Sequence, residues 1–291
     1  MKIAVLGNEG SWYVDQLLVA ARTRGHQCER VDFRRIRSDV TMSALGVQSD
    51  EVNLSNSDAI IVRTMPPGSL EQVVYRMDVL LELQRQGKLV LNHPRAIECA
   101  VDKFLTTSRL AQAELPIPRT IVCETTDQAM EAFQLLGGDI VVKPIFGAEG
   151  RGIIRLSDPD LAFRSFRTLE RLNNVLYLQE FIQHEGYDVR VLLLDGEVIG
   201  AIKRSNQTDF RTNISRQGTA TIHYPSEEEK NLAISAARTV HAGFAGVDLL
   251  YDLAGRCYVI EVNAVPGWRA FQKATDIDVA KLVIEYLERN Q

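Results

Sequence analysis

Three oxygen-bearing side chains near the C-terminal end, Asp248, Glu261 and Asn263, have the types and spacing that suit a divalent cation. Segments 246–252 and 257–263 are rich in β-branched and aromatic residues on either side of a glycine-containing break, which predicts a β-hairpin. A four-residue loop would place Asp248 opposite Glu261, with Asn263 on the same face because side chains alternate along a strand. Two like charges in opposition destabilise a hairpin, so we favour a hard cation such as Mg²⁺ between them over a solvated acidic face.

A glycine-rich stretch follows the predicted strand 140–144, which carries Lys143 near its end. Gly147, Gly150 and Gly152 let the backbone approach a ligand closely and present N–H groups to anionic oxygens. The lysine adds a point charge for the same oxygens, so the pattern indicates a cradle for a nucleoside triphosphate. It is not a P-loop because no Gly-Lys-Ser/Thr follows. By itself, such a stretch also suits a simple turn between two strands.

Cations and amides are concentrated over residues 203–216. Lys203, Arg204, Arg211 and Asn213 are candidates for stabilising the charge that develops on phosphoryl or tetrahedral oxygens, because pre-placed donors and the rigid fork of arginine suit that task. A second basic group indicates solvated surface that attracts an acidic substrate at most weakly; it comprises Arg30, Arg34, Arg35 and Arg37.

Strands alternate with helices over the first ninety residues, which predicts a parallel α/β unit over 1–92. The pattern continues with a long helix over 94–114 and divides the remainder into regions 93–182 and 183–291. The turn at 7–10 lacks the G-x-G-x-x-G order of dinucleotide-binding folds. A nicotinamide-dependent oxidoreductase built on this unit therefore remains only an alternative.

The whole chain has the composition of a soluble globular enzyme. It has 291 residues, of which 45% are hydrophobic and 24% charged, and a net charge of −5, which gives no general attraction for nucleic acid or anionic membrane. No apolar run is long enough to cross a bilayer. The four cysteines lack metal-ligand spacing, so free thiols in a reducing, cytoplasmic setting are expected.

The order and spacing of these pieces resemble the ATP-grasp ligases, most closely the ribosomal protein S6–glutamate ligase-like (RimK-type) branch. The resemblance covers nearly the whole chain. Its most specific portions are Val-Val-Lys-Pro (141–144), Gln-Glu-Phe-Ile (179–182), Asp-Val-Arg (188–190), Phe-Arg-Thr-Asn (210–213), Ala-Gly-Val-Asp (245–248) and Glu-Val-Asn-Ala-Val-Pro-Gly (261–267). It implies an α/β fold with α+β character in the ATP-grasp part: an N-terminal parallel α/β pre-ATP-grasp domain followed by a two-lobed ATP-grasp fold.

The resemblance also implies a role for each site residue. The ATP-binding set would be Lys103, Lys143, Gly147, Gly150, Gly152, Glu180, Phe181, Ile182, Asp188, Arg211, Thr212 and Asn213. Within this set the two lysines hold the α- and β-phosphates, and Glu180 and Phe181 line the adenine pocket. The catalytic candidates are Arg211, Asn213, Lys203 and Arg204, and the metal ligands are Asp248, Glu261 and Asn263. Candidate substrate-binding residues are Arg63, Arg216, Trp268 and Arg269.

The sequence departs from the branch where acceptor groups are expected. Gln217-Gly218 replaces a Gly-Gly pair, and residues 268–271 replace a Leu-Glu-Gly run. The expected activity is ATP-dependent carboxylate–amine ligation through an acyl phosphate, with Mg²⁺ or alternatively Mn²⁺. It would add glutamate or a similar amino acid to a carboxylate on a small molecule, coenzyme or protein. We also expect a homo-oligomer that binds neither nucleic acid nor membrane. A non-catalytic ATP-binding regulatory module is the main alternative.

Overall fold

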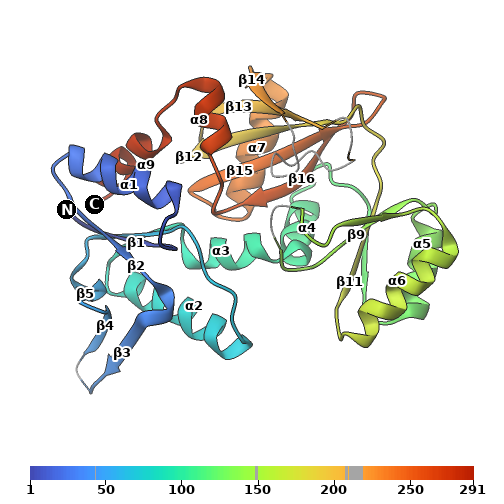
Figure 1. Cartoon of the computed structure of the whole chain (residues 1–291). Coiled ribbons are helices and arrows are strands. Elements are labelled where there is room, and N and C mark those ends of the chain that lie inside the picture. The colour runs from blue at the N-terminus through green and yellow to red at the C-terminus, as the bar shows by residue number, and fades with distance from the viewer. Residues whose placement is uncertain (43, 148–149, 207–208, 210–218) are drawn as a thin grey trace.

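The computed structural model describes residues 1–42, 44–147, 150–206, 209 and 219–291. Figure 1 shows a blue and cyan N-terminal part beside a large orange and red sheet, with a smaller green and yellow part on the other side of that sheet. None of the helices in these ranges has the length and apolar character that a membrane crossing requires. All four cysteines are free, as expected.

The N-terminal sheet is parallel, in the order β2-β1-β6-β7, as the alternating pattern predicted. Its central strands β1 and β6 are buried on both faces because helices cover them. The strands are Lys2–Leu6 (β1), Gln27–Val31 (β2), Ala59–Val62 (β6) and Leu89–Leu91 (β7), and the helices are Trp12–Thr23 (α1) and Leu70–Arg85 (α2). Helix α2 begins with a capping box in which Ser69 and Gln72 satisfy each other's backbone N–H groups.

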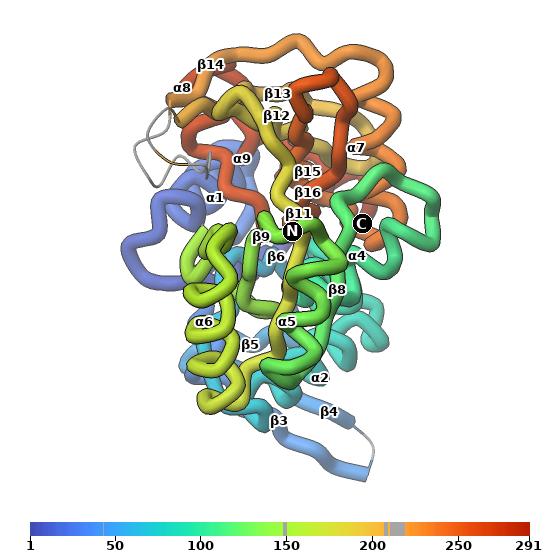
Figure 2. The backbone as a smooth tube through the Cα atoms, turned by 90° about the vertical axis from the view of Figure 1, so that its right-hand side faces the viewer, coloured from blue at the N-terminus to red at the C-terminus, as the bar shows by residue number. Residues whose placement is uncertain are grey.

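An antiparallel meander inside this part was not predicted. Its elements are Ile36–Val40 (β3), Leu45–Ser49 (β4) and Val52–Asn53 (β5), flanked by short 3₁₀ turns at Phe33–Arg35 (η1) and Leu54–Asn56 (η2). Figure 2 shows β3 and β4 projecting away from the body as a ribbon. The basic group interpreted above as solvated surface belongs to regular elements: Arg30 lies on β2, Arg34 and Arg35 on η1, and Arg37 on β3.

The single helix expected over 94–114 is wrong. The chain forms two helices, α3 (Pro94–Val101) and α4 (Lys103–Gln112), which are separated at Asp102. Asp102 adopts an extended conformation, and its side chain accepts a hydrogen bond from the backbone N–H of Leu105. Aspartate is a favoured N-cap because it satisfies a free donor of the first turn. The break makes Lys103 the first residue of α4 and turns it toward the glycine-rich stretch.

The smaller part contains an antiparallel sheet in the order β10-β9-β11-β8, with α5 and α6 on one face (Figures 1 and 2). Its apolar cluster lies between the sheet and these helices. The strands are Thr120–Cys123 (β8), Ile140–Lys143 (β9), Ile154–Leu156 (β10) and Leu176–Glu180 (β11), and the helices are Thr126–Leu135 (α5) and Pro159–Arg171 (α6). The opposite face of the sheet remains available for a ligand.

The C-terminal part is built on a five-stranded antiparallel sheet in the order β14-β13-β12-β15-β16, with α7 packed against it. The strands are Tyr187–Leu194 (β12), Glu197–Ser205 (β13), Thr219–His223 (β14), Phe244–Tyr251 (β15) and Cys257–Asn263 (β16). The helices are Glu227–Thr239 (α7), Arg269–Thr275 (α8) and Val279–Arg289 (α9). A capping box of Ser226 and Glu229 begins α7.

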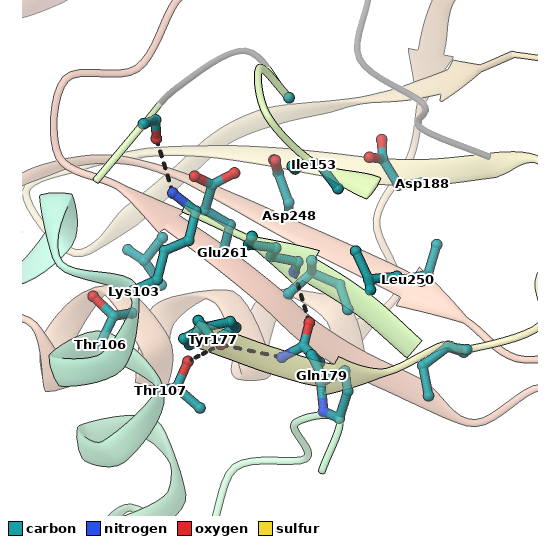
Figure 3. Close-up of a pocket in the computed structure, with 18 of the residues that line it drawn as sticks. Lys103, Thr106, Thr107, Ile153, Tyr177, Gln179, Asp188, Asp248, Leu250 and Glu261 are labelled. Carbon is teal, nitrogen blue, oxygen red and sulfur yellow. Dashed lines mark hydrogen bonds between the residues drawn. The ribbon is translucent and has the colours of Figure 1, made fainter. Parts of the chain in front are cut away.

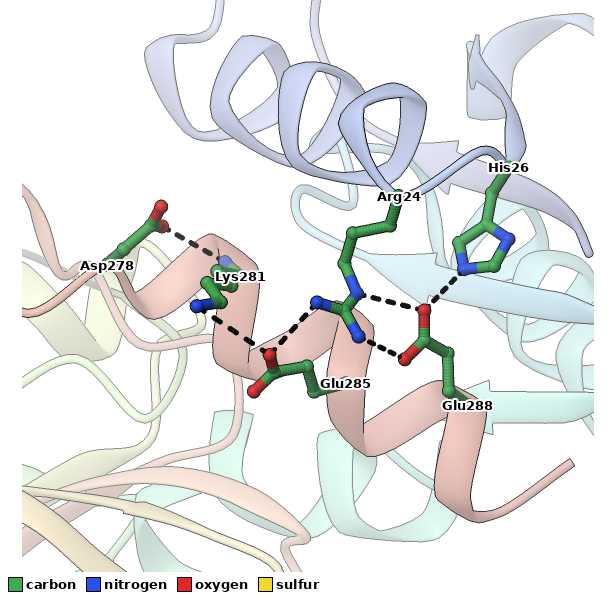
Figure 4. Close-up of polar contacts among 6 residues, drawn as sticks. All are labelled: Arg24, His26, Asp278, Lys281, Glu285 and Glu288. Atoms are coloured by element: carbon green, nitrogen blue, oxygen red, sulfur yellow. Dashed lines mark hydrogen bonds and ion pairs between the residues drawn. The ribbon is translucent and has the colours of Figure 1, made fainter.

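The two ends of the chain are fastened to each other. Helices α1 and α9 pack through one apolar cluster that contains Leu17, Ile284 and Leu287. At its rim, the guanidinium group of Arg24 binds both carboxylate oxygens of Glu288, at 2.9 and 2.6 Å (Figure 4). Because exposed ion pairs contribute little stability, the apolar contact is the main link between the termini.

Candidate active site

A cavity lies between the sheet of the smaller part and the C-terminal sheet (Figure 3). Many predicted site residues line it: Lys103, Lys143, Gly147, Gly150, Glu180, Phe181, Ile182, Asp188, Arg204, Asp248 and Glu261. Residues that the sequence did not single out also contribute, among them Thr106, Thr107, Tyr177, Leu250 and Ile260. The structure therefore brings the glycine-rich stretch and the acidic hairpin to one place, although they are about a hundred residues apart in sequence.

Lys143 lies on the floor of the cavity. Its side chain is buried, and Nζ donates a hydrogen bond to Oε1 of Gln179 at 2.6 Å. Burial lowers the pKa of Lys143 to about 8; the nearby Glu261 and Asp248 oppose this shift, and Lys103 adds to it. Burial and a neighbouring cation both disfavour the charged form of this amine, so an anionic ligand that binds beside it would stabilise the charge.

Lys103 reaches the same region from the first turn of α4. Its Nζ donates to the carbonyl oxygen of Gly147 at 2.9 Å (Figure 3), and burial lowers the pKa of its ammonium group. Gly150 has φ +70°, a conformation that side chains with a Cβ rarely adopt. The glycine at this position therefore permits the turn that carries backbone groups over the cavity.

A chain of buried polar groups supports Lys143 and was missed by the sequence reasoning. Gln179 donates through Nε2 to the hydroxyl groups of Thr120, at 2.9 Å, and Tyr177, at 3.3 Å. The Tyr177 hydroxyl is also 2.7 Å from that of Thr107. Alternation along β11 was the available signal, because Leu176 and Leu178 face the apolar cluster while the two polar residues face the cavity.

The predicted register of the acidic hairpin is confirmed, although by a different route. Tyr251 pairs with Cys257, so the connecting loop has five residues rather than the four expected. A β-bulge at Ile260 then shifts the register by one, and Asp248 pairs with Glu261. The extra residue of a bulge changes which side chains share a face. Here it restores the alignment that the longer loop would have lost.

The carboxylate of Asp248 is held by two arginines. Arg190, its cross-strand partner, donates through Nε to Oδ1 at 2.6 Å and through Nη2 to Oδ2 at 2.7 Å. Nη2 of Arg204 lies 2.9 Å from Oδ2 of Asp248, and Arg204 also forms a two-bond pair with Asp188, at 2.6 and 2.5 Å. These arginines outweigh the effect of burial and lower the pKa of Asp248.

This arrangement leaves room for a metal ion. An ionised carboxylate offers about four acceptor positions, of which the arginines use three at Asp248, so one position on Oδ1 remains. Glu261 makes no ion pair or hydrogen bond with the described residues. Asn263 is not among the residues that line the cavity, and its amide Nδ2 is buried with no hydrogen-bond partner in the described part of the chain. Because two carboxylates and an amide are hard oxygen donors, these residues fit Mg²⁺ with phosphate oxygens completing its shell.

Apolar side chains also line the cavity. Leu250, Ile182 and Phe181 line it, and Figure 3 shows Leu250 on the opposite side of the view from Lys103. The Glu180 carboxylate accepts a hydrogen bond from the backbone N–H of Arg119 at 2.7 Å. A flat, uncharged group such as a nucleobase would suit these walls.

Several candidates lie elsewhere. Lys203 faces the other side of the sheet, where its Nζ lies 3.6 Å from the centre of the Tyr187 ring. Gly152 does not line the cavity. Trp268 is fully buried against Tyr13 and Phe244, and Arg269 is exposed. Arg63 is buried beside Trp268, with 4.4 Å between its guanidinium carbon and the ring centre. Outside the described residues are Arg211, Thr212, Asn213 and Arg216.

Known proteins resemble this chain over its full length. The model of the RimK PreATP-grasp domain matches residues 1–97, and that of the RimK-like ATP-grasp domain matches residues 100–287. The tetrahydromethanopterin:alpha-L-glutamate ligase of Methanosarcina acetivorans is 32% identical over 309 residues, covering 95% of each chain. The ribosomal protein bS6–L-glutamate ligase of Escherichia coli O139:H28 is also 32% identical, over 294 residues, covering 100% of this chain and 96% of the relative.

Solved structures share the fold. The ATP-grasp ligase PsnB complexed with minimal precursor, Mg and ADP has a TM-score of 0.76 and is 23% identical, covering 99% of this chain and 96% of that chain. D-cycloserine synthetase DcsG has a TM-score of 0.75 at 18% identity, covering 100% of both chains. With two family models matching almost every residue, the chain belongs to the RimK-like ATP-grasp family.

Proposed function

We propose that this protein uses ATP to join the amino group of L-glutamate to a carboxylate of an acceptor molecule, forming an amide bond and releasing ADP and phosphate. The observation that carries the proposal is the cavity in which two lysines and a glycine turn face a row of oxygen donors. The glutamate ligases that are about a third identical over the whole chain support the choice of amino acid. Their two acceptors differ, so a coenzyme and a protein tail are both candidates here.

The residues that line the cavity, and Asn263 beside it on β16, have distinct tasks. Lys143 and Lys103 bind the phosphates, while Gln179 orients the first and the glycine turn orients the second. Leu250, Phe181 and Ile182 enclose the base. Asp248, Glu261 and Asn263 would hold magnesium, which when bound neutralises charge on the β- and γ-phosphates.

The reaction then needs positioning more than a protein nucleophile. The acceptor carboxylate attacks the γ-phosphorus, the bond to the bridging oxygen breaks, and ADP leaves. The amine of glutamate attacks the resulting acyl phosphate, and phosphate departs from the tetrahedral intermediate. Pre-placed cations favour both steps because negative charge is spread over oxygens in each. Arg211 and Asn213 remain the predicted partners of those oxygens.

The proposal is tested by measuring ADP release from the pure protein with ATP, Mg²⁺, single amino acids and a set of carboxylate acceptors. We expect release that depends on L-glutamate and on one acceptor class, accompanied by a mass increase of the acceptor by one or more glutamyl residues. Tight ATP binding without ADP release in any mixture would instead favour the regulatory module.

The lowered pKa of Lys143 predicts a pH dependence of ATP affinity. A triphosphate stabilises the charged amine, so binding above pH 8, where free Lys143 is neutral, requires uptake of a proton. The dissociation constant should be constant below about pH 7 and rise by up to tenfold per pH unit above pH 8. Calorimetry at pH 7, 8 and 9 measures it. Lys143→Arg, whose guanidinium group stays charged, should abolish the rise; an unchanged rise in that variant would assign it to another group.

A further inference from the structure

Arg63 is a buried cation that has no acidic partner among the described residues. The residue is 7% exposed, and within the described part of the chain its side chain makes one hydrogen bond, from Nη2 to the carbonyl oxygen of Pro266 at 2.8 Å. Its Nε atom is buried and has no partner among the described residues. Burial lowers the pKa of Arg63 to about 9, and the nearby Tyr13 opposes this shift. A buried charge left without a counter-ion is strongly unfavourable, so an anionic ligand bound beside Arg63 would offset this cost.

The position of Arg63 in the fold suits a ligand. It directly follows β6, and its backbone N–H donates to Leu6 of β1 at 2.8 Å. In the order β2-β1-β6-β7, the chain leaves β1 and β6 in opposite directions across the sheet. Open parallel sheets bind ligands outside the carboxyl ends of the strands at such a switch point.

Other positive groups surround the same edge. Arg30, on β2, donates to the carbonyl oxygen of Gly7 at 3.4 Å and forms no ion pair with the described residues. Helix α1 begins just beyond Gly7, and its N-cap residue Ser11 makes no side-chain capping bond. The first turn of a helix presents free N–H groups and the positive end of the dipole. Arg63, Arg30 and the N-terminus of α1 therefore all place positive charge near Gly7.

The walls fix the guanidinium group in place. Its carbon lies 4.4 Å from the centre of the Trp268 ring and 5.2 Å from that of Tyr13. A Cβ at Gly267 would lie 2.8 Å from the Tyr13 hydroxyl oxygen, so a side chain at this position would displace the Tyr13 ring. The indole Nε1 of Trp268 is also buried without a partner among the described residues, which adds a free donor.

A short segment of chain connects the surroundings of Arg63 to the hairpin that carries Asp248 and Glu261. Pro266, which Arg63 binds, is three residues beyond Asn263, and three residues of extended chain span at most about 11 Å. Asn92, at the end of β7, fixes the same segment by donating to the carbonyl oxygens of Ala264 and Phe244. A substrate whose reacting group lies at the metal can therefore reach Arg63 with another part.

We propose that Arg63, assisted by Arg30 and the first turn of α1, binds a carboxylate of the substrate that does not react. The proposal rests on the proposed function, in which both carboxylates of L-glutamate survive and the acceptor can carry others. It assigns substrate recognition to the N-terminal sheet, and it gives Trp268 the task of holding the arginine rather than touching the acceptor.

The test measures binding rather than turnover. Calorimetry in the presence of Mg²⁺ and a non-hydrolysable ATP analogue compares L-glutamate with L-glutamine and L-isoglutamine, in which one carboxylate or the other is a neutral amide. The dipeptide glutamylglutamate serves as the acceptor probe. We expect the wild-type protein to bind one carboxylate probe about 10–100-fold more tightly than its amide. Arg63→Met should lose that preference while binding the amide as before. If Arg63→Met weakens the binding of L-glutamate, the carboxylate belongs to the amino acid; if it weakens the binding of the dipeptide, the carboxylate belongs to the acceptor.

Matched variants separate recognition from folding. Arg76 is a similarly buried arginine of this part, 5% exposed, that donates to the carbonyl of Pro66 at 2.7 Å. Arg76→Met should keep the full preference for the carboxylate. If Arg63→Met does not fold, Arg63→Lys takes its place in the test. Lysine retains the charge but not the planar fork of arginine, so we expect it to bind the carboxylate probe about tenfold more weakly than the wild-type protein does. Full preference in a folded Arg63→Met or Arg63→Lys, or no preference in the wild-type protein, would overturn the proposal. Failure of the ligase function itself would appear separately, as absent ADP release.

Discussion

Replacing Glu261 with Gln is expected to lower the rate of ADP formation at least about 10³-fold, which corresponds to about 4 kcal/mol of lost transition-state stabilisation. The amide keeps the size of the side chain but removes one of the two negative charges that face each other across the hairpin. At the proposed site, one carboxylate and two amides would then be left to hold a divalent ion, so its affinity should fall. Initial rates of ADP release over a range of Mg²⁺ concentrations measure the effect.

The fold should survive this change. Glu261 makes no ion pair or hydrogen bond in the described part of the chain, and removing one of two opposed charges relieves repulsion. Circular dichroism and the melting temperature should therefore be close to those of the wild-type protein. Glu131→Gln, at an exposed position of α5, is the matched control and should not alter the rate. A near-normal rate for Glu261→Gln would remove the argument for magnesium at the hairpin.

The hairpin shows how far sequence patterns can be followed. Strand composition and alternation were enough to pair Asp248 with Glu261, because a period of two fixes which side chains share a face. The loop length and the bulge at Ile260 were both missed, and their effects on register cancel. Neither is visible in the sequence, since a bulge depends on how the strand packs against its neighbours.

Contacts between distant segments were the main limit. The break at Asp102 has a local signal, an aspartate before a helical run, that was overlooked within a long helical pattern. The arginine pairs of Asp248 and Asp188 have none, because they depend on the order of strands in the sheet. Lys203 and Arg204 differ for a simple reason: neighbouring residues on a strand face opposite sides, so only one of them can meet the cavity.

These pairs give Arg204 a structural task that its sequence position did not reveal. It is 3% exposed and joins two carboxylates, Asp188 and Asp248, which are themselves buried. The aspartates raise the pKa of its guanidinium group against the effect of burial. Asp248, the proposed metal ligand, is thus held in orientation by a side chain that also binds Asp188.

Arg204→Met is accordingly expected to lower the free energy of unfolding by about 3–5 kcal/mol, because it removes the two-bond pair with Asp188 and leaves the buried carboxylate of Asp248 with one arginine, Arg190, among the described residues. Urea denaturation measures this loss. Lys203→Met, one residue away on the other face, should cost no more than about 1 kcal/mol because it removes only the contact with the Tyr187 ring. If Arg204→Met instead unfolds like the wild-type protein but releases no ADP, the arginine acts on the reacting phosphate and the buried pairs are incidental.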